Sequence, residues 1–171
     1  MKIDLYNHVM PVRYLEMMQQ HSKDQGIVKR MSSLRMLWDI EARVQMLTEQ
    51  FPDVQQVLTL SLPAPELVGG PDLAPALARI ANDGMAAMVA RWPQTFPAFI
   101  AALPMNDVPA ALEEMDRAIT TLGARGVQIC TNVNGRPLDE PEFFPVFERV
   151  TRTTCRCSCI RSGPRPGLIM S

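Results

Sequence analysis

Residues 96–133, FPAFIAALPMNDVPAALEEMDRAITTLGARGVQICTNV, contain the pattern that decides the fold class. Residues 96–103 are nearly all apolar, as is typical of a strand covered on both faces. Asp107 is a suitable N-cap for a helix that continues to Leu122 with apolar residues at helical spacing. A second strand is expected at 126–133, and the helix between the strands is long enough for them to pair in parallel.

The same alternation extends in both directions along the chain. The pattern predicts strands at 2–9 and 54–62, helices at 12–21, 40–51, 73–92 and 142–152, and loops at 22–34, 64–72 and 134–141. Asp39 is a suitable N-cap for the helix that begins at residue 40. This order indicates an α/β protein with a parallel sheet. Four βα units are half of a (β/α)8 barrel, which typically needs about 250 residues, and they fit a small open sheet equally well.

The composition is that of a single globular domain: 171 residues, 47% apolar, 20% charged, with a formal net charge of -1. The apolar content argues against disorder, and 17 basic against 18 acidic residues leave no electrostatic signature for nucleic acid or an anionic membrane. The first residues, MKIDLYNHVMP, lack the long apolar segment of a signal peptide. We therefore expect a cytoplasmic protein that does not bind nucleic acid or membranes.

The end of the first expected strand carries a candidate site. Alternation along residues 2–9 would place Asp4, Tyr6 and His8 on one face of the strand. Metal ligands and catalytic residues of a barrel occupy the carboxyl ends of its strands, which favours a functional His8. A lone histidine at a strand end is more often a hydrogen-bonded structural residue, so both interpretations stay open.

Asn132 and Asn134 lie at the end of the last expected strand, and Arg136 and Asp139 follow them. Side chains at that point would face the same rim of the sheet as His8. The alternative interpretation is that Asn-Gly-Arg-Pro is simply turn chemistry.

Residues 153–171 differ from the rest of the chain. They fit neither helix nor strand periodicity, so we expect a partial barrel domain at 1–152 followed by an irregular tail. Three cysteines, Cys155, Cys157 and Cys159, alternate within this tail. Their spacing does not match the C-x2-C pairs of structural zinc sites.

A frameshift after Arg152 would explain the tail. Every Cys codon is TGT or TGC, so a frame that starts one base earlier reads Leu, Met or Val at each of these three cysteines. The same shift replaces Ile160 by His or Tyr, because a Cys codon precedes it. With GC-rich codons, which 14 arginines against three lysines suggest, the shifted segment reads Arg-His-Asp-Leu-Pro-Val-Leu-Leu-His-Pro. That is an apolar strand with a polar end.

Five segments together resemble the amidohydrolase-related family, the group that includes aminocarboxymuconate-semialdehyde decarboxylase and the resorcylate decarboxylases. They are IDLYNHVMPVRYLEMM, LWDIEARVQML, VLTLSLP, FPAFIAALPMNDVPAALEEMDRAI and GVQICTNVNGRPLDEPEFFPVFERV. The resemblance covers roughly the first 150 residues and implies the N-terminal half of a (β/α)8, TIM-type barrel.

The resemblance also implies a site. Family members bind one divalent metal, commonly zinc or manganese, through a first strand that ends Asp-x-His-x-His. This chain matches at Asp4 and His8, while Tyr6 stands where the first histidine is expected. His8 is therefore the expected metal ligand, and a phenol is a poor substitute for imidazole on zinc. The residues expected to contact a small carboxylated substrate are Tyr6, Arg30, Asn132 and Asn134, and Arg35 is near the same place as Arg30.

Two hypotheses of function follow. In the first, the chain is the N-terminal part of a metal-dependent decarboxylase or hydrolase of small carboxylated substrates, and it is inactive alone because it lacks most of the site. In the second, it is a noncatalytic α/β protein or barrel fragment that self-associates through open sheet edges. Both lead us to expect a homo-oligomer.

Overall fold

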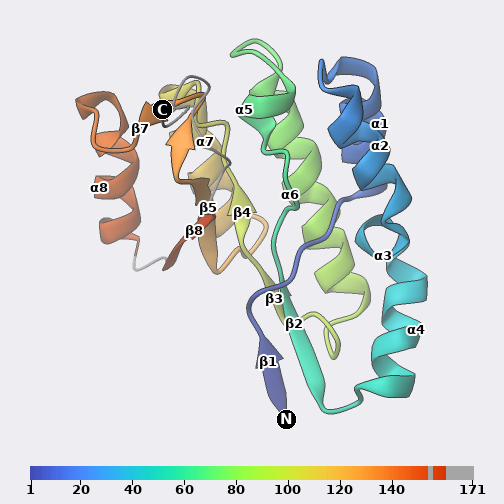
Figure 1. The fold of residues 1–171 in the computed structure, drawn as a ribbon. Coiled ribbons are helices and arrows are strands. Elements are labelled where there is room, and N and C mark those ends of the chain that lie inside the picture. The colour runs from blue at the N-terminus through green and yellow to red at the C-terminus, as the bar shows by residue number, and fades with distance from the viewer. Residues whose placement is uncertain (154–155, 161–171) are drawn as a thin grey trace, which may run out of the picture.

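The computed structural model describes residues 1–153 and 156–160. Strands run through the middle of the view in Figure 1, with α1, α4 and α6 to their right and α8 to their left, and α7 packs between α6 and α8. The strands are β1 (Lys2–Asp4), β2 (Val54–Leu58), β3 (Ala98–Phe99), β4 (Ala101–Ala102), β5 (Gly126–Cys130), β6 (Asn132–Val133), β7 (Arg136–Pro137) and β8 (Arg156–Ile160). The helices are α1 (Val12–His21), α2 (Gln25–Ser33), α3 (Arg35–Trp38), α4 (Ile40–Gln50), α5 (Pro65–Val68), α6 (Ala74–Arg91), α7 (Val108–Thr120), the short 3-10 turn η1 (Pro141–Phe143) and α8 (Phe144–Arg152).

The main sheet is parallel throughout its described pairs. Its order is β1-β2-β3 followed by β4-β5-β8, and each pair is parallel. Ile100 separates β3 from β4, and its N–H donates to Leu58 O at 2.8 Å. β3 and β4 are therefore two parts of one strand, which pairs with β2 at its start and with β5 at its end. This order is that of consecutive strands in a barrel, and it confirms the α/β, parallel prediction.

Local signals that the sequence carries explain several boundaries. The predicted helix at 12–21 is α1, with the same bounds. Asp39 and Asp107 are N-caps, and their carboxylates accept from the N–H groups of Ala42 and Ala110 at 3.1 and 3.0 Å. Each cap satisfies an amide that the first turn of the helix leaves unpaired.

Several segments differ from the sequence prediction. The predicted loop at 22–34 contains α2, whose cap Asp24 accepts from Ile27 N at 3.0 Å and whose Val28 and Met31 are buried. The predicted loop at 64–72 contains α5. The irregular tail expected after residue 152 contains a regular strand, β8, because residues 156–160 extend the sheet beside β5. The remainder of that tail, residues 154–155 and 161–171, lies outside the described residues.

The strand predicted at 2–9 is interrupted. β1 ends at Asp4, and the ladder with the second strand resumes only as a single bridge between Val9 and Leu60. Residues 5–8 therefore leave the regular pairing, and the prediction that Asp4, Tyr6 and His8 share one strand face is wrong.

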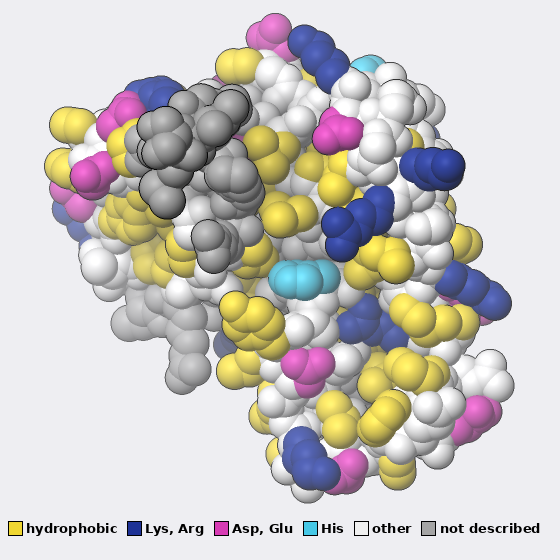
Figure 2. All heavy atoms as spheres, in the orientation of Figure 1, with side chains coloured by type: hydrophobic (Ala, Val, Ile, Leu, Met, Phe, Trp, Pro, Cys, Tyr) yellow, Lys and Arg dark blue, Asp and Glu magenta, His cyan; other side chains and the backbone are white. Residues whose placement is uncertain are grey.

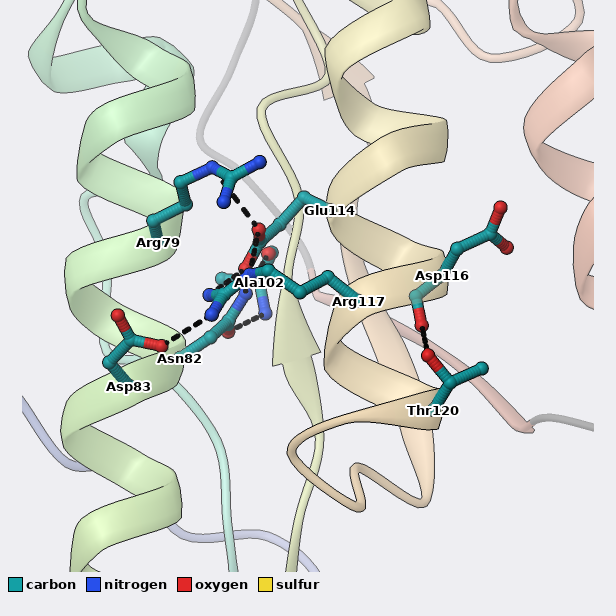
Figure 3. A network of polar contacts seen from close by, with 8 residues as sticks. All are labelled: Arg79, Asn82, Asp83, Ala102, Glu114, Asp116, Arg117 and Thr120. Carbon is teal, nitrogen blue, oxygen red and sulfur yellow. Dashed lines mark hydrogen bonds and ion pairs between the residues drawn. The ribbon is translucent and has the colours of Figure 1, made fainter.

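A buried polar network joins α6, α7 and β4 (Figure 3). The Asn82 amide pairs with both main-chain groups of Ala102, at 2.9 and 2.8 Å, and also donates to Glu114 Oε1 at 2.7 Å. Glu114 in turn accepts from Arg117 at 2.8 Å, and Arg117 contacts Asp83 at 2.7 Å. The buried carboxylate is thus paired and hydrogen-bonded, which fixes the helix layer against the strand. In the part of the chain that the structure describes, no helix has both the length and the apolarity to cross a bilayer.

Candidate functional site

The interruption at residues 5–8 is held by side chains in place of a strand ladder. Asp4 Oδ1 accepts from Tyr6 N at 2.8 Å, and the Asn7 amide donates to Asp4 O at 3.1 Å and to Val57 O at 2.8 Å. These bonds satisfy backbone groups that would otherwise lack partners. They turn the chain so that His8 comes to the carboxyl end of the sheet.

Thr59, at the end of the second strand, contacts both Asn7 and His8. Its hydroxyl donates a short hydrogen bond to the Asn7 carbonyl, and its Oγ1 lies 2.8 Å from His8 Nδ1. Thr59 is itself fixed, because its carbonyl accepts from Val9 N at 2.8 Å and its side chain is buried.

Arg43 lies beneath the interruption and is only 7% exposed. Its guanidinium donates to His8 O at 2.6 Å, to Gln56 Oε1 at 2.9 Å and to Asn7 Oδ1 at 3.1 Å. Burial lowers the pKa of Arg43, and the nearby Asp4 acts in the opposite direction. The sequence pattern alone does not single out Arg43 as a site residue. The available signal was its position one turn before Leu47 on the apolar side of α4, where a charge must find buried partners.

A small pocket opens where the first and last described strands of the sheet end. Its lining residues are Leu5, Tyr6, His8, Thr59, Ser158, Cys159 and Ile160. Its volume is about 40 Å³, far below the roughly 300 Å³ of the smallest typical ligand pockets. The pocket as described accommodates a few atoms beside His8 and not a whole aromatic acid. Figure 2 shows hydrophobic side chains spread over the same face of the molecule.

The environment of His8 favours the neutral imidazole. Partial burial lowers the pKa of His8, Arg43 lowers it further, and Asp4 and the Leu60 carbonyl oppose the shift. A neutral imidazole has one ring nitrogen with a free lone pair, which is the form that binds a metal or accepts a proton.

The described donors do not complete a metal centre. His8 has the right chemistry for zinc or manganese, and Tyr6, 91% exposed, lines the same pocket. Among residues 1–153 and 156–160, however, no three His, Cys, Asp or Glu side chains are placed to hold one ion together. The described part of the chain therefore offers one imidazole toward a site that needs further ligands.

The other candidate residues do not line this pocket. Asn132 Oδ1 accepts from Gly135 N at 2.9 Å, and Asn134 and Gly135 have φ values of 51° and 86°. They form the turn of the β6–β7 hairpin, the conformation that Asn-Gly favours. Arg30 is exposed on α2. Arg35 is paired with Asp39 at 2.7 Å.

The sequence is similar to known enzymes. The family described as amidohydrolase matches residues 3–155. A 2-amino-3-carboxymuconate-6-semialdehyde decarboxylase of Dictyostelium discoideum is 30% identical over 167 residues, which cover 86% of this chain and 45% of the relative. A gamma-resorcylate decarboxylase of Rhizobium sp. is 42% identical over 109 residues, which cover 57% of this chain and 32% of the relative. The chain thus spans less than half the length of these relatives.

Solved structures agree in fold. A 2,6-dihydroxybenzoate decarboxylase from Rhizobium superposes with a TM-score of 0.79 at 25% identity, covering 99% of this chain and 52% of that one. A dihydroxybenzoic acid decarboxylase from Polaromonas sp. JS666, with bound manganese and the inhibitor 2-nitroresorcinol, has a TM-score of 0.78 at 28% identity and covers 96% and 50%. Each match leaves about half of the other enzyme without a counterpart in this chain.

Proposed function

Since the chain belongs to the amidohydrolase family, we propose that it forms the N-terminal part of a metal-dependent carboxy-lyase for small carboxylated substrates. The relatives described above are named as decarboxylases, which favours C–C bond cleavage over hydrolysis. One relative binds manganese, so a divalent metal is part of the proposal.

The placement of His8 is the observation that carries this proposal. The histidine lies at the carboxyl end of a parallel sheet, where barrel enzymes hold their chemistry, and its environment favours the metal-binding, neutral form. His8 would supply one ligand, and Tyr6 beside it would contact the substrate or a bound water.

We further propose that the 171-residue chain is inactive alone. One imidazole holds a catalytic ion poorly without partners, and the described pocket is too small for an aromatic acid. Purified chain should release no CO2 from 2,6-dihydroxybenzoate above a no-enzyme control, with or without manganese. Manganese-dependent CO2 release that His8→Ala abolishes would contradict the inactivity and support the site.

A second candidate function, self-association, is favoured by the exposed first strand. Ile3 and Leu5 are 52% and 62% exposed, and within the described residues β1 pairs on one side only. Such an edge is a template for another strand. Light scattering after gel filtration should therefore give a mass above that of one chain. Ile3→Lys should return the chain to a monomer, and a monomeric parent chain would exclude this candidate.

A further inference from the structure

We propose that Thr59 and Arg43 are positioning residues that fix His8 in one tautomer and one ring orientation. In that state the hydrogen is on Nδ1 and the lone pair of Nε2 is left for the pocket. This inference concerns the site of the proposed function. The tautomer itself is argued from the structure, and only the use of the lone pair to bind a metal rests on the proposed function.

The tautomer follows from counting protons at Thr59. A threonine hydroxyl has one proton, and here the hydroxyl donates to the carbonyl of Asn7, a group that can only accept. The oxygen of Thr59 must then accept in its 2.8 Å contact with His8 Nδ1. Nδ1 therefore carries the hydrogen, and in the neutral ring Nε2 does not.

Arg43 holds the main chain on which this arrangement depends. Residues 5–8 lack a strand ladder, so no regular pairing fixes His8. Arg43 binds the His8 carbonyl at 2.6 Å and the Asn7 side chain at 3.1 Å. A further bond of its guanidinium, to Gln56 at 2.9 Å, ties both to the second strand. The buried guanidinium of Arg43 thus positions two groups together: Asn7, whose carbonyl accepts the Thr59 hydrogen bond, and the backbone of His8.

The arrangement is a common device for histidines that act through one nitrogen. A partner on one ring nitrogen sets the tautomer and aims the other. Here the partner is a hydroxyl whose own proton is committed elsewhere, so it cannot reverse its role without losing the bond to Asn7.

Nitrogen NMR of the histidine rings tests the proposal without any activity. The chain has two histidines, His8 and His21, and exposed His21 on α1 provides an internal reference. At about pH 8, above the ordinary imidazole pKa, long-range 1H–15N correlation should show His8 mainly as the Nδ1–H form. Thr59→Val should shift most of the population to Nε2–H, and Thr59→Ser should restore the wild-type spectrum.

Matched variants separate positioning from a general loss of structure. Thr48→Val removes an exposed hydroxyl on α4 that bonds to Val44 O in its own helix at 2.9 Å, and it should leave the His8 signals unchanged. Arg43→Lys keeps the positive charge but loses the planar guanidinium that binds His8, Asn7 and Gln56 together. It should give mixed tautomers or doubled His8 signals in a chain with unchanged circular dichroism. The exposed Arg35→Lys is its control. If Arg43→Lys does not fold, the Thr59 pair still decides the tautomer.

Two results would overturn the inference: a wild-type His8 that is mainly Nε2–H, or a Thr59→Val variant with an unchanged tautomer. Neither depends on CO2 release. The Nε2–H form in the parent chain overturns this inference and leaves the proposed function standing, whereas metal retention that does not change in His8→Ala contradicts the proposed function and leaves the tautomer assignment standing.

Discussion

The regular strand pairing of β1 ends at Asp4, and side-chain hydrogen bonds hold the following residues in its place. This arrangement brings His8 to the pocket. Asn7, Thr59 and Arg43 supply the bonds that a neighbouring strand would otherwise make. The buried guanidinium is the costliest of these groups to place, and its hydrogen bonds offset the loss of water. The local irregularity is therefore part of the site.

Tyr6 gives a prediction about metal affinity. It lines the same pocket as His8, so Tyr6→His would bring a second imidazole to the candidate ion. Titration of the chain with zinc should show tighter binding by about tenfold or more. Tyr6→Phe, which adds no donor, is the control. Unchanged affinity in Tyr6→His would show that Tyr6 is adapted to its position and is not a lost ligand.

Glu66 on α5 gives a prediction about pH. Its side chain is buried, its Oε2 has no hydrogen-bond partner among the described residues, and burial raises its pKa from 4.5 to about 7. Between these values the folded chain holds a proton that the unfolded chain has lost. This group's contribution to stability is therefore complete below about pH 4.5 and is lost as the pH rises to about 7, by about 3 kcal/mol in all.

Urea unfolding of Glu66→Gln at about pH 5 and about pH 8 checks this sign. The variant should lack most of the stability loss that the parent shows between these two values. Glu113→Gln, an exposed glutamate on α7, should keep the parent's dependence. An equal pH dependence in parent and Glu66→Gln would contradict the prediction.

At the scale of elements, the predictable parts are those with local signals. α1 and the caps Asp39 and Asp107 follow from spacing and N-cap chemistry. α2 was missed because its sequence is polar, and its burial comes from tertiary contacts of Val28 and Met31. The break after Asp4 was missed because alternation alone predicts a continuous strand, and Arg43, distant in sequence, makes the break tolerable.

The network between α6, α7 and β4 predicts an asymmetric mutational response. Asn82→Ala leaves the main-chain groups of Ala102 and the carboxylate of Glu114 short of partners, so it should cost about 3 kcal/mol. Asp83→Ala removes only the outer, half-exposed pairing with Arg117 and should cost less than about 1 kcal/mol. Urea denaturation measures both, and equal losses would contradict the account.

At the scale of the whole molecule, the tail carries a proposal about the gene. We propose that a one-base shift follows Arg152. β8 lies where a fifth barrel strand would, and Ile160 at its end lines the pocket beside His8. The other frame replaces that residue by His or Tyr, so it would bring a polar donor to this pocket.

Sequencing the encoding DNA tests the shift. The restored frame should continue with further strand–helix units that carry Asp or His at strand ends. An early stop codon in that frame, or a continuation without such units, would exclude a frameshift and leave residues 153–171 as the chain's own tail.

Metal content tests the central claim most directly. The described residues place one imidazole, His8, toward a centre that needs further ligands. After dialysis against excess manganese and then buffer, the chain should retain well under one ion per molecule, and His8→Ala should retain less still. His21→Ala, which removes an exposed imidazole on α1, is the control. One tightly held ion per chain, or retention that does not change in His8→Ala, would contradict the account.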